Sequence, residues 1–238
     1  MITAFLAKIQ RYGQVSEAEK AFLKRIVMHL HKYGPGQEIA AQGMSPPESC
    51  LVTSGFAGRI KTLSGGRRQI LSLQVPGDFC DLQGFLLKEI DHSIEALSQC
   101  EIAKVPHSAI ADITERFPRL TRALWWDTAV DAAVQREWMT SMGCRSAYEQ
   151  IAHLLCEMLL RLQAVGWADS NSYDLPITQE RLGDAFGLST VHVNRTLQAL
   201  RQNRLIVSEG ARIIIPDVEA LKKVAGFDPA YLTGQAPA

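Results

Sequence analysis

The stretch ITQERLGDAFGLSTVHVNRTLQAL, residues 177–200, decides the fold of the C-terminal part of the chain. Thr178 is placed to cap a helix N-terminus, because its hydroxyl can accept an unpaired backbone N–H. Gly187 is expected to end that helix, since glycine adopts the left-handed conformation that a helix C-terminus often needs. Ser189 is expected to cap a second helix, whose core-facing residues recur every three or four positions: Val193, Leu197 and Leu200. Two helices joined by a tight glycine turn form a helix-turn-helix, whose second helix enters the DNA major groove.

The second helix also carries outward-facing polar residues, which favour a DNA reader over two helices of an ordinary all-α core. Asparagine and arginine at such positions can make bidentate contacts to purine edges. The predicted base-contact residues are Thr190, His192, Asn194 and Arg195. Hydroxyl, amide and helix N-terminal N–H groups suit phosphate contacts, and the predicted residues are Thr178, Gln179 and Ser189.

Residues 177–197 resemble, without a gap, the helix-turn-helix of the Crp/Fnr family of bacterial transcription regulators. The positions that carry this resemblance are Thr178, Gly183, Gly187, Ser189, Val193 and Arg195. The resemblance implies that Arg195 reads a guanine. The family usually has Arg and Glu, or Val and Glu, where this chain has Thr190 and Val191, so the half-site sequence stays open.

Length and composition allow one large or two ordinary domains, and a DNA reader on such a chain needs only a local basic patch. The 238 residues are 47% apolar, and 25 basic residues balance 25 acidic ones. No apolar run approaches the roughly 18–20 residues of a membrane-spanning helix, and the N-terminus lacks the pattern of a signal peptide. The five cysteines are odd in number and form no CxxC pair, which argues against a local metal site. We therefore expect reduced cysteines, no metal and a cytoplasmic location away from membranes.

Residues 33–105 change to short alternating runs separated by glycines, about 8–12 residues apart, which predicts a jelly-roll or β-barrel. Glycines 55, 58, 65, 66 and 77 are expected where strands turn. The region also resembles the Crp/Fnr sensor domain, which has the cyclic-nucleotide-binding β-roll fold. The motif Pro76-Gly77-Asp78-Phe79 is part of that resemblance.

The predicted effector site departs from that of the cyclic-nucleotide binders in the family. Those members carry Gly-Glu-Leu and, some ten residues later, an Arg that neutralises the phosphate. This chain has Asp81-Leu82-Gln83 and His92-Ser93-Ile94 instead, which argues against cyclic AMP as the effector. The candidate pocket residues for an unknown small molecule are Phe79, Cys80, Asp81, His92 and Ser93.

Cys80 and His92 leave alternatives open within this region. They could bind haem or respond to oxidation, but a small buried cysteine and a surface histidine are the simpler interpretation. No cysteine precedes Cys50, so the N-terminal iron–sulfur cluster of some family members is excluded. A cupin-type metal enzyme would need clustered His and carboxylate ligands, and the β region has only His92 and His107. Nucleophile-elbow, P-loop and GxGxxG motifs are absent from the sequence, so we expect no enzyme.

A long helical stretch joins the two parts. Its apolar residues predict a dimer seam, with a helix packed wholly on its own barrel as the alternative: Leu120, Leu124, Val130, Val134 and Trp138. Gly143 is expected to break this helix. Residues 1–33 are expected to be helical, and residues 204–206 and 211–215 to form the two strands of a wing.

The sequence therefore predicts an α+β chain. Residues 1–116 form a jelly-roll or β-roll sensor, 117–143 a dimerisation helix, and 144–238 a winged helix-turn-helix. The resemblance implies a homodimer on a palindromic site in double-stranded DNA, controlled allosterically through the β-roll and working with RNA polymerase. One alternative is a constitutive or redox-controlled DNA binder without an effector. Another is a cyclic-nucleotide-binding regulatory subunit that acts on a protein partner.

Overall fold

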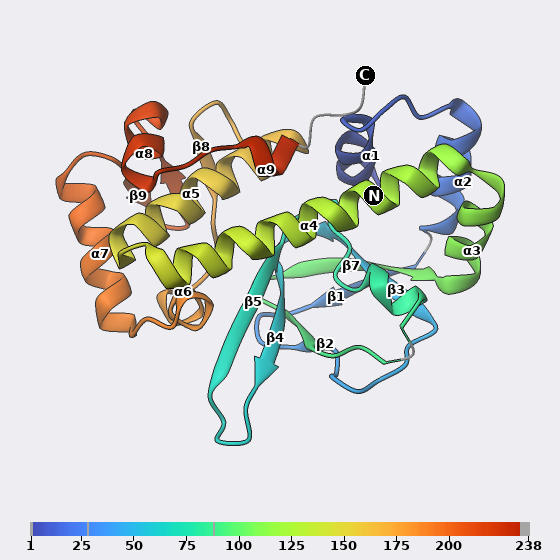
Figure 1. Cartoon of the computed structure of the whole chain (residues 1–238), viewed down its shortest axis with the longest axis horizontal. Coiled ribbons are helices and arrows are strands. Elements are labelled where there is room, and N and C mark those ends of the chain that lie inside the picture. The colour runs from blue at the N-terminus through green and yellow to red at the C-terminus, as the bar shows by residue number, and fades with distance from the viewer. Residues whose placement is uncertain (1, 28, 88, 234–238) are drawn as a thin grey trace.

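The computed structural model describes residues 2–27, 29–87 and 89–233, and it has the predicted α+β architecture. Helix α4 (Pro118–Cys144) crosses the molecule, with a sheet domain below one half of it and a helical domain around the other half (Figure 1). Over the described residues, none of the helices is both long and apolar enough to cross a membrane.

The β-roll consists of two antiparallel sheets that face each other. One sheet has the strand order β1-β7-β3 and the other the order β2-β6-β4-β5. Their bounds are β1 Leu30–Tyr33, β2 Glu38–Ala40, β3 Glu48–Ser54, β4 Ala57–Thr62, β5 Arg68–Gln74, β6 Ser93–Ala96 and β7 Cys100–Pro106. A short 3-10 helix (Leu82–Phe85) follows the bridge between Leu51 and Phe79. Gly58 lies inside β4 against Leu97 rather than at a turn, which corrects one of the predicted turn glycines.

The N-terminal segment is helical only in part. Helices α1 (Thr3–Gln10) and α2 (Glu17–Ile26) form as expected, and Ser16 and Glu19 close a capping box at the start of α2. The prediction of helix up to residue 33 is wrong, because β1 pairs with β7 along its whole length. These cross-strand hydrogen bonds outweigh the weak local helical pattern.

The long helix ends one residue later than expected, and glycine is not the cause. Gly143 lies inside α4, and the helix stops because Arg145 is extended. Ser146 then caps α5 (Ala147–Ala164) through a capping box with Glu149. Helix α3 (His107–Arg116) connects the β-roll to α4.

The C-terminal domain contains the expected helix-turn-helix and wing. Its elements are β8 Ser172–Asp174, α6 Gln179–Phe186, α7 Thr190–Gln202, β9 Val207–Glu209, β10 Arg212–Ile214, α8 Val218–Ala225 and α9 Ala230–Thr233. The predicted first wing strand at 204–206 is wrong: Arg204 has a positive φ of 57°, and β9 begins at Val207. The wing sheet has the order β8-β10-β9 because the segment before α6 supplies a third strand.

The two domains share one hydrophobic core. Phe56, Ile60 and Leu73 of the β-roll belong to the same cluster of buried side chains as Trp138 of α4 and Phe186 of α6. The rings of Trp138 and Phe186 lie 5.2 Å apart between centroids. The C-terminal domain is therefore packed against the β-roll and α4 rather than tethered by a loop.

Gly183 provides a test of how the helix-turn-helix closes. A Cβ added there would lie 2.5 Å from the Leu188 carbonyl oxygen, so Gly183→Ala should lower the free energy of unfolding by about 1–3 kcal/mol. Gly13→Ala is the control, because Gly13 lies in the loop between α1 and α2 and a Cβ there meets no atom within 4 Å. Urea unfolding of both variants measures the difference. Equal stabilities would contradict the close approach of α6 to the turn.

Candidate DNA-reading head and sensor junction

The helix-turn-helix is fixed by three local backbone devices that the sequence predicted. The Thr178 hydroxyl accepts the Arg181 N–H, and the Ser189 hydroxyl accepts the His192 N–H. Between them Gly187 adopts the left-handed conformation with a φ of 67°. These caps set the start of α7, the recognition helix, relative to α6.

One face of α7 is buried and the other is open to solvent. Val193, Leu197 and Leu200 are buried in the shared core, as predicted. The exposed residues near its N-terminus include Thr190, Val191, His192 and Arg195, which are joined by Gln198 one turn later. The sequence analysis missed Gln198, although its spacing of three residues from Arg195 places it on the same face.

Two of the predicted contact residues bind each other. The Asn194 side-chain amide donates to the Gln179 side-chain oxygen at 3.0 Å, so α6 and α7 are joined across the turn. The side-chain oxygen of Asn194 and the side-chain N–H donors of Gln179 are not used in this hydrogen bond. The Asn194 side chain is thereby held at one orientation.

The C-terminal domain, which we also call the head, has fewer unpaired basic side chains than the sequence suggests. Arg181 turns away from α7 and pairs with Glu95 of β6 at 2.5 Å, and Arg68 of β5 meets the other oxygen of Glu95 at 2.6 Å. Arg212 on the wing pairs with Asp169 and lies 3.8 Å from an Asp174 oxygen. Arg195 is exposed and forms no ion pair with any residue that the structure describes. Arg201, near the end of α7, also forms no ion pair with the described residues, but its Nη1 lies 3.5 Å from the Ser208 hydroxyl.

The predicted pocket residues of the β-roll are buried, apart from the partly exposed Ser93, and they contact their own domain. The Asp81 carboxylate accepts the Cys50 N–H at 2.5 Å, and the Cys80 N–H donates to the Cys50 carbonyl at 2.8 Å. Ser93 accepts the Gln42 N–H through its hydroxyl at 3.1 Å. His92 is 3% exposed, and its Nδ1 lies 2.8 Å from an Asp91 oxygen, so the expectation of a surface histidine is wrong.

Arg59, which sequence analysis did not single out, holds the β-roll to α4. Its Nε donates to the Cys80 carbonyl at 2.6 Å and its Nη2 to the Phe79 carbonyl at 3.2 Å. Its Nη1 lies 2.5 Å from an Asp131 oxygen on α4. The signal available in the sequence was a basic residue among the small and apolar residues that begin β4, Ala57, Gly58 and Ile60.

A second set of charges lies where α1, α4 and α5 meet the turn after β5. Asp78 accepts Lys8 of α1 at 2.5 Å and Arg161 of α5 at 2.6 Å, and Lys8 also pairs with Asp127 of α4. Arg161 in turn contacts Glu157 at 2.9 Å, a carboxylate with no exposed surface. Asp78 therefore joins the sensor to the C-terminal domain directly.

The electrostatics of this junction follow from burial and from these partners. Burial alone would raise the pKa of Asp78, but Lys8 and Arg161 outweigh it and lower that pKa to about 2. Burial would lower the pKa of Lys8, and the two aspartates raise it above its ordinary value. Burial raises the pKa of Asp127 despite its contact with Lys8. Asp78 is thus the carboxylate that stays ionised most firmly.

The thiols offer little chemistry. Cys144 at the end of α4 is exposed, whereas the other cysteines are buried: Cys50, Cys80, Cys100 and Cys156. Burial raises the pKa of the Cys50 and Cys156 thiols to about 12 and that of Cys80 well above its ordinary value. Thiols in such surroundings are poor nucleophiles, which supports the simple interpretation of Cys80 as a buried apolar residue.

Comparison with known proteins agrees with both domains. Residues 149–224 match the family model described as a Crp-like helix-turn-helix domain, and residues 30–117 match the cyclic nucleotide-binding domain. The chain is 29% identical over 214 residues to the transcriptional activator protein FnrL of Cereibacter sphaeroides, covering 88% of this chain and 85% of the relative. It is 33% identical over 175 residues to the nitrogen fixation regulation protein FixK of Bradyrhizobium diazoefficiens, covering 71% and 72%.

The solved structure of FixK2 from Bradyrhizobium japonicum has the same fold, with a TM-score of 0.75 over 84% of this chain and 98% of that one at 24% identity. A cyclic-nucleotide-binding-type domain joined to a helix-turn-helix defines a DNA-binding transcription regulator. The chain belongs to the Crp/Fnr family of these regulators.

The lowered pKa of Asp78 predicts how stability changes in acid. Because its folded pKa of about 2 is below the unfolded value of about 4, the stabilisation is complete above pH 4 and is lost as the pH falls towards 2. Asp78→Asn lacks this contribution, so between pH 5 and pH 3 the unmodified protein should lose about 1 kcal/mol more than the variant. Urea unfolding at several pH values measures this, with Asp112→Asn on α3 as the control. Parallel curves for Asp78→Asn and the unmodified protein would contradict the ionised junction.

Proposed function

We propose that the chain acts as a homodimer that reads a palindromic site in double-stranded DNA, with one α7 helix in each of two successive major grooves. The observation that supports this proposal most strongly is the open N-terminal half of α7, where Arg195 is exposed and without an ion pair in the described chain. Paired recognition helices about 34 Å apart would match one turn of the duplex.

Base recognition is assigned to the solvent face of α7. Arg195 can bind a guanine through two N–H donors, and Asn194 keeps one acceptor while Gln179 fixes its orientation. His192 and Thr190 extend this face towards the start of the helix. We add Gln198 as a further candidate, because it is exposed one turn after Arg195.

Phosphate contacts are assigned to the N-termini of α6 and α7. The Thr178 and Ser189 oxygens accept backbone N–H groups, so the hydroxyl hydrogens remain free to donate to a phosphate. The first N–H groups of each helix also point outward with the positive end of its dipole. Gln179 contributes its side-chain donors at the same edge.

The dimer face proposed for α4 is different from the predicted seam. Leu120, Leu124, Val134 and Trp138 are buried by this chain's own domains, and Val130 lines a cavity beside them, so they cannot meet a second copy. The opposite face of α4 carries a stripe at alternating steps of four and three residues: Pro118, Arg122, Trp125, Ala129, Ala132, Arg136, Met139 and Gly143. We name these eight residues the α4 stripe.

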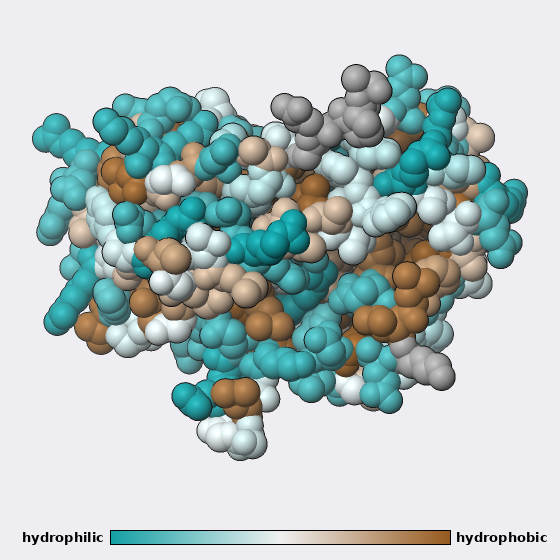
Figure 2. Space-filling model, viewed as in Figure 1, coloured by the Kyte–Doolittle hydropathy of each residue, from teal (hydrophilic) through white to brown (hydrophobic). Residues whose placement is uncertain are grey.

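The α4 stripe has the spacing of a two-helix seam. Trp125 is 75% exposed and Met139 is 68% exposed, although both are large and apolar. Steps of four and three residues keep one face of a helix turned towards a partner helix. The two arginines interrupt the apolar surface, but their aliphatic stems can cover it while the charged ends reach water. Figure 2 shows the face of the molecule across which α4 runs, where hydrophobic and hydrophilic surface is mixed.

The proposed dimer is tested by a charge placed in the α4 stripe. Met139→Glu should raise the dimer dissociation constant by at least tenfold, because it would bury two like carboxylates at a two-fold seam. Met44→Glu is the matched control, since Met44 is 58% exposed but lies in the loop after β2. Analytical ultracentrifugation over a range of protein concentrations measures the equilibrium. A Met139→Glu protein as dimeric as the control would rule out this face.

The proposed DNA contact is tested at Arg195. Arg195→Ala should cost about 1–3 kcal/mol of specific binding and relax selectivity at one base position of each half-site. Selection from random duplexes, followed by titration of the recovered site at one stated salt concentration, measures both effects. Arg25→Ala, an exposed arginine on α2, should leave affinity and selectivity unchanged. Unaltered selectivity in Arg195→Ala would show that another face reads DNA.

Regulation of this dimer would pass through the junction of sensor and head. Relatives of the chain include proteins named transcriptional activators, which supports RNA polymerase as a further partner of the bound dimer. An effector would bias the position of the two heads and so the spacing of the two α7 helices. Control by oxidation is the alternative, and within the chain it would have to begin at Cys144, the exposed thiol.

A further inference from the structure

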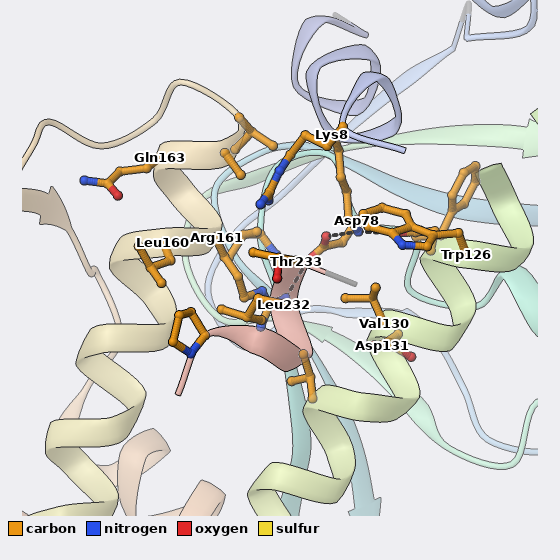
Figure 3. A pocket seen from close by; sticks show the side chains of 18 of the residues that line it. Lys8, Asp78, Trp126, Val130, Asp131, Leu160, Arg161, Gln163, Leu232 and Thr233 are labelled. Carbon is orange, nitrogen blue, oxygen red and sulfur yellow. Dashed lines mark hydrogen bonds and ion pairs between the residues drawn. The ribbon is translucent and has the colours of Figure 1, made fainter. Parts of the chain in front are cut away.

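A cavity of about 470 Å³ opens at the junction between the β-roll, α4 and the C-terminal domain, within the size range of small-molecule sites. Figure 3 shows Lys8 of α1 and Asp78 on one side, Arg161 and Leu160 of α5 on another, and Trp126 and Val130 of α4 opposite them. Leu232 and Thr233 of α9 lie over the cavity. The candidate residues Cys80, Asp81, His92 and Ser93 do not line it.

Most of the cavity wall is apolar. Side chains from three parts of the fold supply it: Val75, Phe79, Val130, Leu160 and Leu232. An occupant must therefore have an apolar body, because a polar one would lose its water without regaining hydrogen bonds. The body would displace water from surface that the folded chain leaves uncovered.

Two donors of the wall, the Arg11 guanidinium and the Trp126 indole, have no acceptor among the described residues. Each lining carboxylate already faces a cation: Lys8 lies beside Asp78 and Asp127, and Arg59 lies beside Asp131. Arg11, by contrast, forms no ion pair with the described residues. The Nε1–H of Trp126 is buried and has no acceptor within the part of the chain that the structure describes. A buried donor of this kind costs free energy until an acceptor reaches it.

From these contacts we propose that the junction cavity binds an apolar carboxylate, a medium-chain fatty acid or a compound of the same chemistry. The carboxylate accepts the Trp126 Nε1–H and is neutralised by Arg11, and the chain lies against the valines and leucines of the wall. A hydrophobic cation would find no unpaired carboxylate among the lining residues. A neutral amide could use Trp126 but not Arg11.

The bound carboxylate would touch the sensor, α4 and the C-terminal domain at once. Consider the arrangement described here, in which the C-terminal domain packs on the β-roll, and an alternative arrangement of the same domains. A ligand that binds the first more tightly increases its population, by a factor set by the ratio of its affinities for the two arrangements. This effect on DNA reading rests on the proposed function, whereas ligand binding itself is measured without DNA. Failure of one therefore leaves the other measurable.

The test is calorimetric titration of the full chain with hexanoate, octanoate and decanoate, and with octanamide and octylamine as neutral and cationic analogues. We expect one saturable site per chain, with octanoate at least tenfold tighter than either analogue. Arg11→Ala should weaken octanoate about tenfold towards the amide value, and Arg25→Ala should not. No saturable binding of any of the three acids, or equal binding of acid and amide, would overturn the proposal.

A second pair of variants locates the site. Val130→Trp fills the cavity from α4 and should abolish octanoate binding, while Leu63→Trp, on the exposed hairpin after β4, should leave it intact. Circular dichroism and the melting temperature show whether Val130→Trp is folded. If it is not, Arg11→Ala decides alone, because its side chain is exposed in the free protein. Octanoate binding that survives both Arg11→Ala and a folded Val130→Trp would place the acid elsewhere and refute the site.

Discussion

The carboxylate of Asp78 is the contact on which the arrangement of the domains depends. It lies in the turn after β5, accepts the Val75 N–H at 2.8 Å, and binds Lys8 from α1 and Arg161 from α5. These three charged groups are mostly removed from water, and burying any one of them without the others would cost desolvation free energy that no partner offsets. The turn, the first helix and the C-terminal domain are therefore fixed to one another at a single point.

A second electrostatic contact holds the head itself against the sensor. Glu95 of β6 receives Arg68 from its own sheet and Arg181 from α6, and the Gln69 side-chain amide donates to the Ala185 carbonyl at 2.8 Å. The helix that positions the recognition helix is thus bound by the β-roll. The residue types used for this purpose, arginine and glutamate, are those that a reader of the sequence would assign to DNA or to solvent.

The sequence predicted the local features well because their causes are local. Thr178, Gly187 and Ser189 act within four residues of their own positions, so both caps and the turn could be predicted without knowing any distant contact. The prediction that the apolar face of α4 forms the dimer contact was less successful, because the partner of that face is not local in sequence. The spacing of Leu120, Leu124 and Val134 shows that one face is buried, but it does not say whether the same chain or a second copy buries it. The stripe of alternating spacing went unnoticed because it contains two arginines and two alanines.

The roles of Arg59 and Asp78 depend on partners 70 or more residues away, Asp131 and Lys8 among them, and no spacing rule reports such contacts. The burial of His92 was missed for the same reason, since it follows from the packing of the loop before β6. The sequence therefore predicted that a β-roll and a helix-turn-helix domain are present. It did not predict the surface through which these two domains contact each other.

The core that runs without interruption from Ile60 and Leu73 of the β-roll to Phe186 and Val193 of the head has a thermodynamic consequence. Domains that share buried side chains do not melt separately, so unfolding of one copy should be a single cooperative transition rather than two. The same core limits how far the head can swing, because any rotation would bring apolar surface into water at about 25 cal/mol per Å². The shared core therefore favours small rotations of the C-terminal domain over large ones.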